Sequence, residues 1–171
     1  ESLYLRPFAF ASEAFLGVRP SKVVDYYVIA SPSGSYFTNG LEPISIWVTT
    51  EYHRAGRGGT GAAKTGGNYA SSLLPQQEAY AQGCDQVCFL DDVSQRNLEE
   101  LGGMNIMVVD ADGTVRTPRL TGTILEGSTR SAIIHLLRDS GRSVVEDTIS
   151  LQGLLADIES GRVSEVFACG T

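Results

Sequence analysis

The stretch that decides the fold is Gly58-Gly59-Thr60-Gly61-Ala62-Ala63-Lys64-Thr65-Gly66-Gly67-Asn68-Tyr69. It places Lys64 between two groups of glycines, and residues without a Cβ allow positive φ angles and close approach to a ligand. A lysine that forms imines must lose its proton near neutral pH, which burial and cationic neighbours favour. The small, uncharged neighbours of Lys64 suit such a site. From spacing alone, the alternative is a solvated lysine beside a glycine-rich turn. The stretch does not fit the Gly-x4-Gly-Lys-Ser/Thr pattern of a phosphate-binding P-loop.

On both sides of this stretch, runs rich in β-branched and aromatic residues predict strands. These strands are expected at residues 22–30, 44–50, 86–90, 105–110 and 165–168. The tetrad Asp110-Ala111-Asp112-Gly113 predicts a hairpin turn after one of them.

Three helices are predicted from apolar periodicity and end signals. The first starts at an Asn68 cap and stops at Gly83, and Pro75 inside it predicts a kink or a late start. The second covers residues 129–140, with Ser128 or Thr129 as cap and Gly141 as stop. The third covers residues 151–160 and ends at Gly161.

Composition limits the class of protein. The chain has 171 residues, 42% of them hydrophobic and 19% charged, which predicts one globular domain of mixed α and β class. The net charge of −7 argues against a nucleic-acid partner. No apolar run approaches the roughly 20 residues of a membrane span, and no leader is expected. Cys84, Cys88 and Cys169 are expected to be free thiols, and no metal site is expected.

Several motifs together resemble the branched-chain aminotransferases of fold type IV, which carry pyridoxal 5′-phosphate (PLP). The segment from Glu51-Tyr52-His53-Arg54-Ala55 to Tyr69 resembles their active-site segment. Three other stretches match in the same order, and the chain's end resembles a loop that closes over phosphate and substrate. The stretches are Leu3-Tyr4-Leu5-Arg6-Pro7, Glu99-Glu100-Leu101-Gly102-Gly103-Met104-Asn105 and Leu120-Thr121-Gly122-Thr123-Ile124-Leu125-Glu126-Gly127-Ser128-Thr129-Arg130. The resemblance is greatest to actinobacterial enzymes.

The resemblance implies a set of PLP-binding residues. Lys64 would form the Schiff base and act as the general base between substrate Cα and cofactor C4′. Glu100 would keep the pyridine nitrogen protonated, and Tyr69 would hydrogen-bond the phenolic oxygen. The phosphate would be bound by Arg54 and by Ser128 and Thr129 at a helix start, and Leu125 would pack against the ring. Thr171, in the loop at the chain's end, would also bind the cofactor.

The resemblance also implies the reaction and its setting. The amino group would move between leucine, isoleucine or valine and 2-oxoglutarate, with Tyr4, Arg6, Gly170 and Thr171 as substrate-binding residues. The fold would be the large-domain pseudobarrel, residues 1–171, incomplete at both ends and without the family's small N-terminal domain. The complete enzyme would be a cytoplasmic homodimer, and this segment alone would be inactive.

Two alternatives remain open. Within fold type IV the chain resembles, less closely, D-amino-acid aminotransferases and aminodeoxychorismate lyases. In the alternative outside the enzymes, the chain would be a non-catalytic fragment that needs a partner chain. The sequence departs from the family's pattern at Glu126, where proline is common, and at Ser128, where a β-branched apolar residue is common. An inward carboxylate would weaken anion binding, so Glu126 is expected to face water.

Overall fold

A computed structural model describes residues 2–34 and 42–170. The chain divides into two compact units, Glu1–Pro43 and Ile44–Thr171. The prediction of one domain over all 171 residues stays a prediction.

The first unit is an antiparallel pair of long strands, β1 (Ser2–Ala11) and β2 (Val24–Ser33). The pair is stabilised by stacked aromatic rings on one face, since Phe8 lies opposite Tyr27 with ring centroids 5.6 Å apart. The strand predicted at residues 22–30 is confirmed as β2, displaced toward the C-terminus. The pattern of apolar residues did not predict β1, whose span includes the Leu3-Tyr4-Leu5-Arg6-Pro7 stretch of the resemblance.

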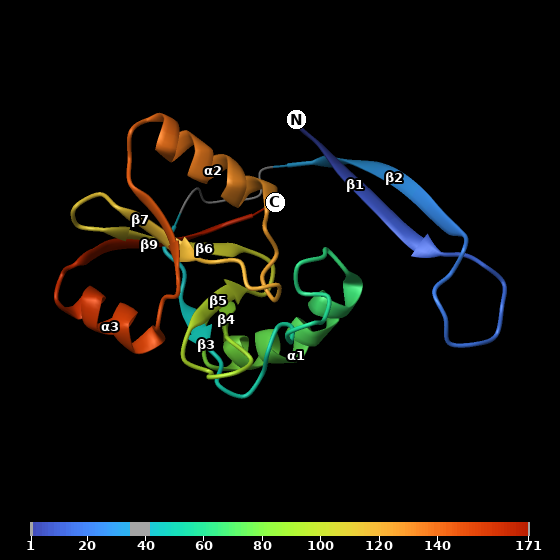
Figure 1. The fold of residues 1–171 in the computed structure, drawn as a ribbon, viewed down its shortest axis with the longest axis horizontal. Helices are drawn as coiled ribbons and strands as arrows, with labels where there is room; N and C mark the ends of the chain where they lie inside the picture. Colours follow the sequence, from blue (N-terminus) through green and yellow to red (C-terminus); the bar gives the residue numbers. More distant parts are fainter. Residues whose placement is uncertain (1, 35–41, 171) are drawn as a thin grey trace. The chain divides into compact units, whose positions relative to one another are not determined.

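The second unit contains two sheets (Figure 1). In the first, β4 (Gln86–Leu90) lies between parallel β3 (Ile46–Val48) and antiparallel β5 (Leu98–Leu101). In the second the strand order is β8 (Val144–Asp147), β7 (Val115–Pro118), β6 (Asn105–Asp110) and β9 (Val163–Cys169). The strands predicted at 86–90 and 105–110 are confirmed to the residue. The one predicted at 44–50 is shorter, the one at 165–168 is longer, and β5, β7 and β8 have no counterpart among the five strands predicted from composition.

The hairpin turn predicted at residues 110–113 is confirmed. The N–H of Gly113 donates to the Asp110 carbonyl at 2.9 Å, and Gly113 has a φ of +87° that glycine adopts without steric cost. The turn joins antiparallel β6 and β7.

The three predicted helices are present as α1 (Gly66–Ala81), α2 (Ser128–Asp139) and α3 (Leu151–Glu159). The predicted caps of the first two were wrong. Thr65 is the N-cap of α1, because the Asn68 side chain bonds the preceding loop instead. Gly127 is the N-cap of α2, with a φ of 71° and no side-chain cap. The late start predicted from Pro75 was also wrong, since α1 begins at Gly66 and continues through Pro75.

Alternation along the strands places the elements of this unit in layers. In β4, Val87 and Phe89 pack with Ala79 of α1, whereas Cys88 and Leu90 face the other way into a central core. In β6, Ile106 faces the same core. The central core also includes Leu98, Leu101, Val108, Ile149, Leu154 and Val163.

The opposite face of β6 carries Met107, which packs with Ile134 of α2. The order is therefore α1, the three-stranded sheet, the four-stranded sheet and α2, with α3 covering the central core through Leu154 (Figure 1). This arrangement brings the beginning of α1, the end of β5 and the beginning of α2 around one site.

The expectation of free thiols is confirmed. Cys84, Cys88 and Cys169 are free thiols, and burial raises the pKa of Cys88 to about 12. Within the described ranges, no helix has the length and apolar character that crossing a membrane requires.

Candidate active site

A cavity of about 220 Å³ opens where α1, the β5–β6 connection and the start of α2 meet. Six of the predicted site residues line it, and three further residues complete its wall. The lining residues are Lys64, Glu100, Leu125, Ser128, Thr129 and Gly170, together with Gly103, Asn105 and Gly127. Sequence reasoning had not assigned a role to these last three.

The remaining predicted residues are not among those that line this cavity. Tyr4 and Arg6 belong to the first unit, where both are exposed on one face of β1 and the Arg6 guanidinium lies 5.3 Å from the Tyr4 ring centroid. Thr171 lies outside the described residues. Tyr69 contacts Lys64, and Arg54 contacts Glu100.

Lys64 follows the glycine-rich loop and stands just before α1. Its side chain is exposed, and Nζ donates a hydrogen bond to the hydroxyl of Tyr69 at 2.7 Å. Tyr69 lies in the first turn of α1, so the start of this helix fixes the distance between the two groups. The arrangement places a phenol beside the primary amine that lines the cavity.

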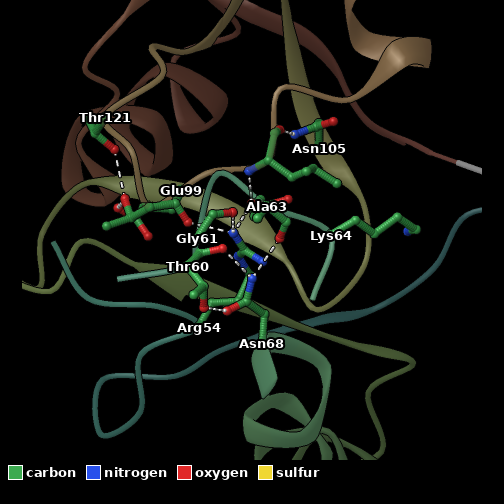
Figure 2. Close-up of polar contacts among 12 residues, drawn as sticks. Arg54, Thr60, Gly61, Ala63, Lys64, Asn68, Glu99, Asn105 and Thr121 are labelled. Carbon is green, nitrogen blue, oxygen red and sulfur yellow. Dashed lines mark hydrogen bonds and ion pairs between the residues drawn. The ribbon is translucent and has the colours of Figure 1, made fainter. Parts of the chain in front are cut away.

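The loop that carries Lys64 is fixed by Asn68. The Asn68 amide donates to the carbonyls of Thr60 and Ala63 at 2.8 and 2.9 Å, and its oxygen accepts from the Thr60 hydroxyl at 2.8 Å (Figure 2). Asn68 is buried, and these bonds satisfy loop carbonyls that lie outside regular structure. The backbone on the N-terminal side of Lys64 is therefore positioned by protein contacts alone.

Glu100 lies on β5 and is only 3% exposed. Its Oε1 accepts the N–H of Leu125 at 2.7 Å and forms an ion pair with Arg54 Nη2 at 2.8 Å. Burial raises the pKa of Glu100 to about 7, against the lowering effects of Arg54 and the Leu125 N–H. The carboxyl therefore gains or loses a proton in the neutral pH range.

Arg54 is as buried as Glu100, at 3% exposure. Its Nη2 donates to the carbonyls of Gly61 and Thr123 at 2.7 and 2.5 Å, which uses both hydrogens of that nitrogen (Figure 2). Arg54 does not line the cavity. Its Nη2 contacts two carbonyls and the Glu100 carboxylate, and the predicted phosphate contact stays a prediction.

Two close backbone approaches need glycine. A Cβ on Gly61 would lie 2.5 Å from the Cα of Thr123, and a Cβ on Gly127 would lie 2.1 Å from Oδ1 of Asn105. The Asn105 amide also donates to the Leu125 carbonyl at 2.8 Å. Glycine clusters in the sequence hinted at such approaches, but nothing in it identified Thr123 or Asn105 as partners.

The start of α2 presents free backbone donors to the cavity. Among the described residues, the first helical bond runs from the Ser131 N–H to the Gly127 carbonyl, and no acceptor is found for the N–H groups of Ser128 and Thr129. Such N–H groups and the helix dipole favour an anion. Glu126 is exposed, which confirms the expectation that it faces water.

The groups that line the cavity fit PLP. The cavity combines a lysine amine, a carboxyl of raised pKa, an apolar side chain at Leu125, and uncapped helix N–H groups suited to a phosphate. Each would suit a different part of the cofactor: the aldehyde carbon, the ring nitrogen, the ring face and the phosphate.

Comparisons with known proteins agree with this set of cavity groups. Residues 1–171 match the family described as amino-transferase class IV, and the chain belongs to that family. A probable branched-chain-amino-acid aminotransferase of Streptomyces coelicolor is 54% identical over 171 residues, which are all of this chain and 47% of the relative.

Solved structures give the same result for the fold. The branched-chain amino acid aminotransferase of Escherichia coli has a TM-score of 0.83 and 34% identity, over 99% of this chain and 54% of that one. An aminotransferase from Brucella abortus bound to the cofactor PLP has a TM-score of 0.80 and 27% identity, over 98% of this chain and 56% of that one. The predicted fold class, the mixed α and β fold of type IV PLP enzymes, is confirmed. The chain spans about half the length of the relatives it matches.

Proposed function

We propose that the protein to which this chain belongs is a PLP-dependent transaminase for branched-chain L-amino acids, with 2-oxoglutarate as the partner keto acid. The observation that carries the proposal is one cavity lined by Lys64, by Glu100 and by the uncapped start of α2. The names of the relatives, which are branched-chain aminotransferases, support the choice of substrate.

In this proposal Lys64 has two tasks. Its amine holds the cofactor covalently, and after release it moves a proton to and from the substrate Cα. PLP supplies the electron sink that makes the Cα proton acidic. Tyr69, 2.7 Å from Nζ, positions the amine and offers a hydroxyl beside it.

Glu100 and the start of α2 bind opposite ends of the cofactor in this proposal. The Glu100 carboxylate accepts a hydrogen bond from the protonated ring nitrogen, and the burial of Glu100 strengthens that charge-assisted contact. The N–H groups and hydroxyls of Ser128 and Thr129 bind the phosphate, while Leu125 packs against the ring. Gly170 lines the same cavity and packs against Met104, since a Cβ there would lie 3.1 Å from the Met104 side chain, and its role toward substrate is assigned by resemblance.

Substrate selection is assigned to Tyr4, Arg6 and Thr171 as well, by resemblance. Tyr4 offers an aromatic surface for a branched side chain, and Arg6 offers a positive charge for the second carboxylate of 2-oxoglutarate. The same proposal includes a homodimer located in the cytoplasm. The alternatives in the fold type IV group act on D-amino acids or aminodeoxychorismate, and both would keep Lys64 and Glu100 in the same roles.

The test is to reduce the full-length protein with borohydride after loading with PLP and to map the pyridoxyl label. The label is expected on Lys64, and Lys64→Ala should lose both label and visible absorbance. Lys22 is the other lysine of this chain and serves as an internal control. A label on any other lysine, with none on Lys64, contradicts the assignment. Assays with L-leucine, D-alanine and aminodeoxychorismate then separate the alternatives.

A further inference from the structure

Arg54 occupies an unusual position for an arginine. It is buried, and one nitrogen, Nη2, contacts three separate segments. Gly61 belongs to the loop before Lys64, Thr123 to the turn before α2, and Glu100 to β5. Each of these segments carries a residue of the cavity wall.

We propose that Arg54 is a positioning residue that holds the Glu100 carboxylate in place and in its charged form, rather than a ligand of the phosphate. The role of Glu100 toward the ring nitrogen rests on the function proposed above, whereas the pairing of Arg54 with Glu100 does not.

The geometry supports a role that acts through Glu100. Both hydrogens of Nη2 are donated to carbonyls, so the guanidinium is fixed independently of the carboxylate. The fixed positive charge then lies 2.8 Å from Oε1, the same oxygen that accepts the Leu125 N–H. Oε1 thus has two partners that come from the protein.

The ion pair between Arg54 and Glu100 affects whether Glu100 is charged. Two adjacent carboxyls, Glu99 and Glu100, are buried beside Arg54, and burial raises the pKa of both. Arg130 of α2 also lowers the pKa of Glu100, and Lys64 is a further charged residue that lines the same cavity. Arg54 has the largest lowering effect on the Glu100 pKa, so its removal should leave Glu100 protonated at neutral pH. A protonated Glu100 lacks the negative charge that stabilises a protonated ring nitrogen.

Two variants separate charge from hydrogen bonding. Arg54→Gln keeps an amide donor for the carbonyls but removes the charge, whereas Arg54→Lys keeps the charge. Arg116→Met is the matched control, because Arg116 is likewise ion-paired, with Asp110 and Asp157, but does not line the cavity. Glu100→Gln identifies the Glu100 signal by its absence.

The first readout is the titration of Glu100 in the full-length protein, as purified and after removal of cofactor, followed by its carboxyl infrared band. In Arg54→Gln the titration should move upward by about one pH unit or more, a tenfold change in proton affinity. Arg54→Lys should titrate close to wild type, and so should Arg116→Met. Equal titration curves for wild type and Arg54→Gln would overturn the proposal.

The second readout is hydrogen exchange at the Leu125 amide, which donates to Glu100. Glu100→Gln and Arg54→Lys should exchange this amide at least tenfold faster than Arg116→Met does. This readout decides the matter if Arg54→Gln does not fold, since unchanged exchange in Arg54→Lys would refute the positioning role. Neither readout depends on transamination, so a failure of the proposed function, seen as an unlabelled Lys64, is distinguishable from a failure here.

Discussion

Gly61 and Thr123 lie in direct backbone contact, although 62 positions separate them in the sequence: a Cβ added to Gly61 would stand 2.5 Å from the Thr123 Cα and carbonyl oxygen. The atoms of Thr123 that the added Cβ would meet belong to the backbone, so no flexible side chain can move aside. The contact joins the loop of Lys64 to the turn before α2, and Arg54 bonds the carbonyls of both residues.

Gly61→Ala should therefore separate the two segments. We expect a loss of about 1–3 kcal/mol in the free energy of unfolding, the usual cost of forced overpacking, together with weaker PLP binding. Gly66→Ala is the control, because nothing lies within 4 Å of a Cβ at Gly66, and its unfolding should be unchanged or slightly harder. Denaturant unfolding of the two full-length variants measures their stability. Equal stability of the two variants would contradict the close contact.

Glu100 should make stability depend on pH. Its pKa rises from 4.5 to about 7 on folding, so the folded protein binds the proton more tightly than the unfolded chain. This contribution is fully present below about pH 4.5 and is lost as pH rises through about 7. It amounts to on the order of 3 kcal/mol, since one pKa unit is about 1.4 kcal/mol.

The measurement is the free energy of unfolding of cofactor-free protein between pH 5 and 8. Relative to Glu100→Gln, the wild type should lose stability as the pH rises. Glu126→Gln changes an exposed glutamate and should follow the wild-type curve. A difference curve between wild type and Glu100→Gln that is flat, or that rises with pH, would refute the raised pKa.

Asn105 and Gly127 should be energetically coupled. Gly127→Ala places a Cβ 2.1 Å from the Asn105 Oδ1 and also strains a backbone with φ 71°. Asn105→Ala removes the overlap but leaves the Leu125 carbonyl without its donor. The double variant should be more stable than the sum of the single losses predicts, by about 0.5–3 kcal/mol. A double-mutant cycle of unfolding free energies measures this, and strict additivity would show that the side chain moves away freely.

Arg130 and Arg138 both bond Glu146, yet they differ in burial. The Arg130 side chain is 3% exposed and also donates to the Pro118 carbonyl, whereas the Arg138 side chain is 50% exposed. Arg130→Met should cost about 1–3 kcal/mol, because it leaves a buried carbonyl unsatisfied. Arg138→Met should cost less than about 0.5 kcal/mol, as exposed ion pairs do. Thermal unfolding of the two variants tests the contrast, which a similar loss in both would disprove.

The sequence predicted the elements whose signal is local. Strand β4 and strand β6 were predicted to the residue because each is a short apolar run bounded by turn residues, and α2 was predicted within one residue by its apolar periodicity. Strand β8 was missed, since it is mostly exposed and resembles a loop in composition.

The site was predicted in a similar way. Motif resemblance identified Lys64, Glu100, Leu125, Ser128 and Thr129, and the structure brings these to one cavity. The position of Arg54 was not predictable, because its partners Gly61, Thr123 and Glu100 come from three segments whose meeting depends on the tertiary fold. The same holds for Asn68, whose side chain bonds a loop and does not cap its own helix.

The Leu125 peptide is bonded on both sides, by Glu100 at its N–H and by Asn105 at its carbonyl. Both side chains come from strands that border the β5–β6 connection, so the entrance to α2 is attached to the sheets before the helix itself begins. Substitutions that loosen the packing of α2 on Met107 should therefore tilt the far end of the helix about a fixed pivot and leave the cavity intact. The mouth of the cavity and the body of α2 thus depend on separate contacts, the two Leu125 bonds and the packing on Met107.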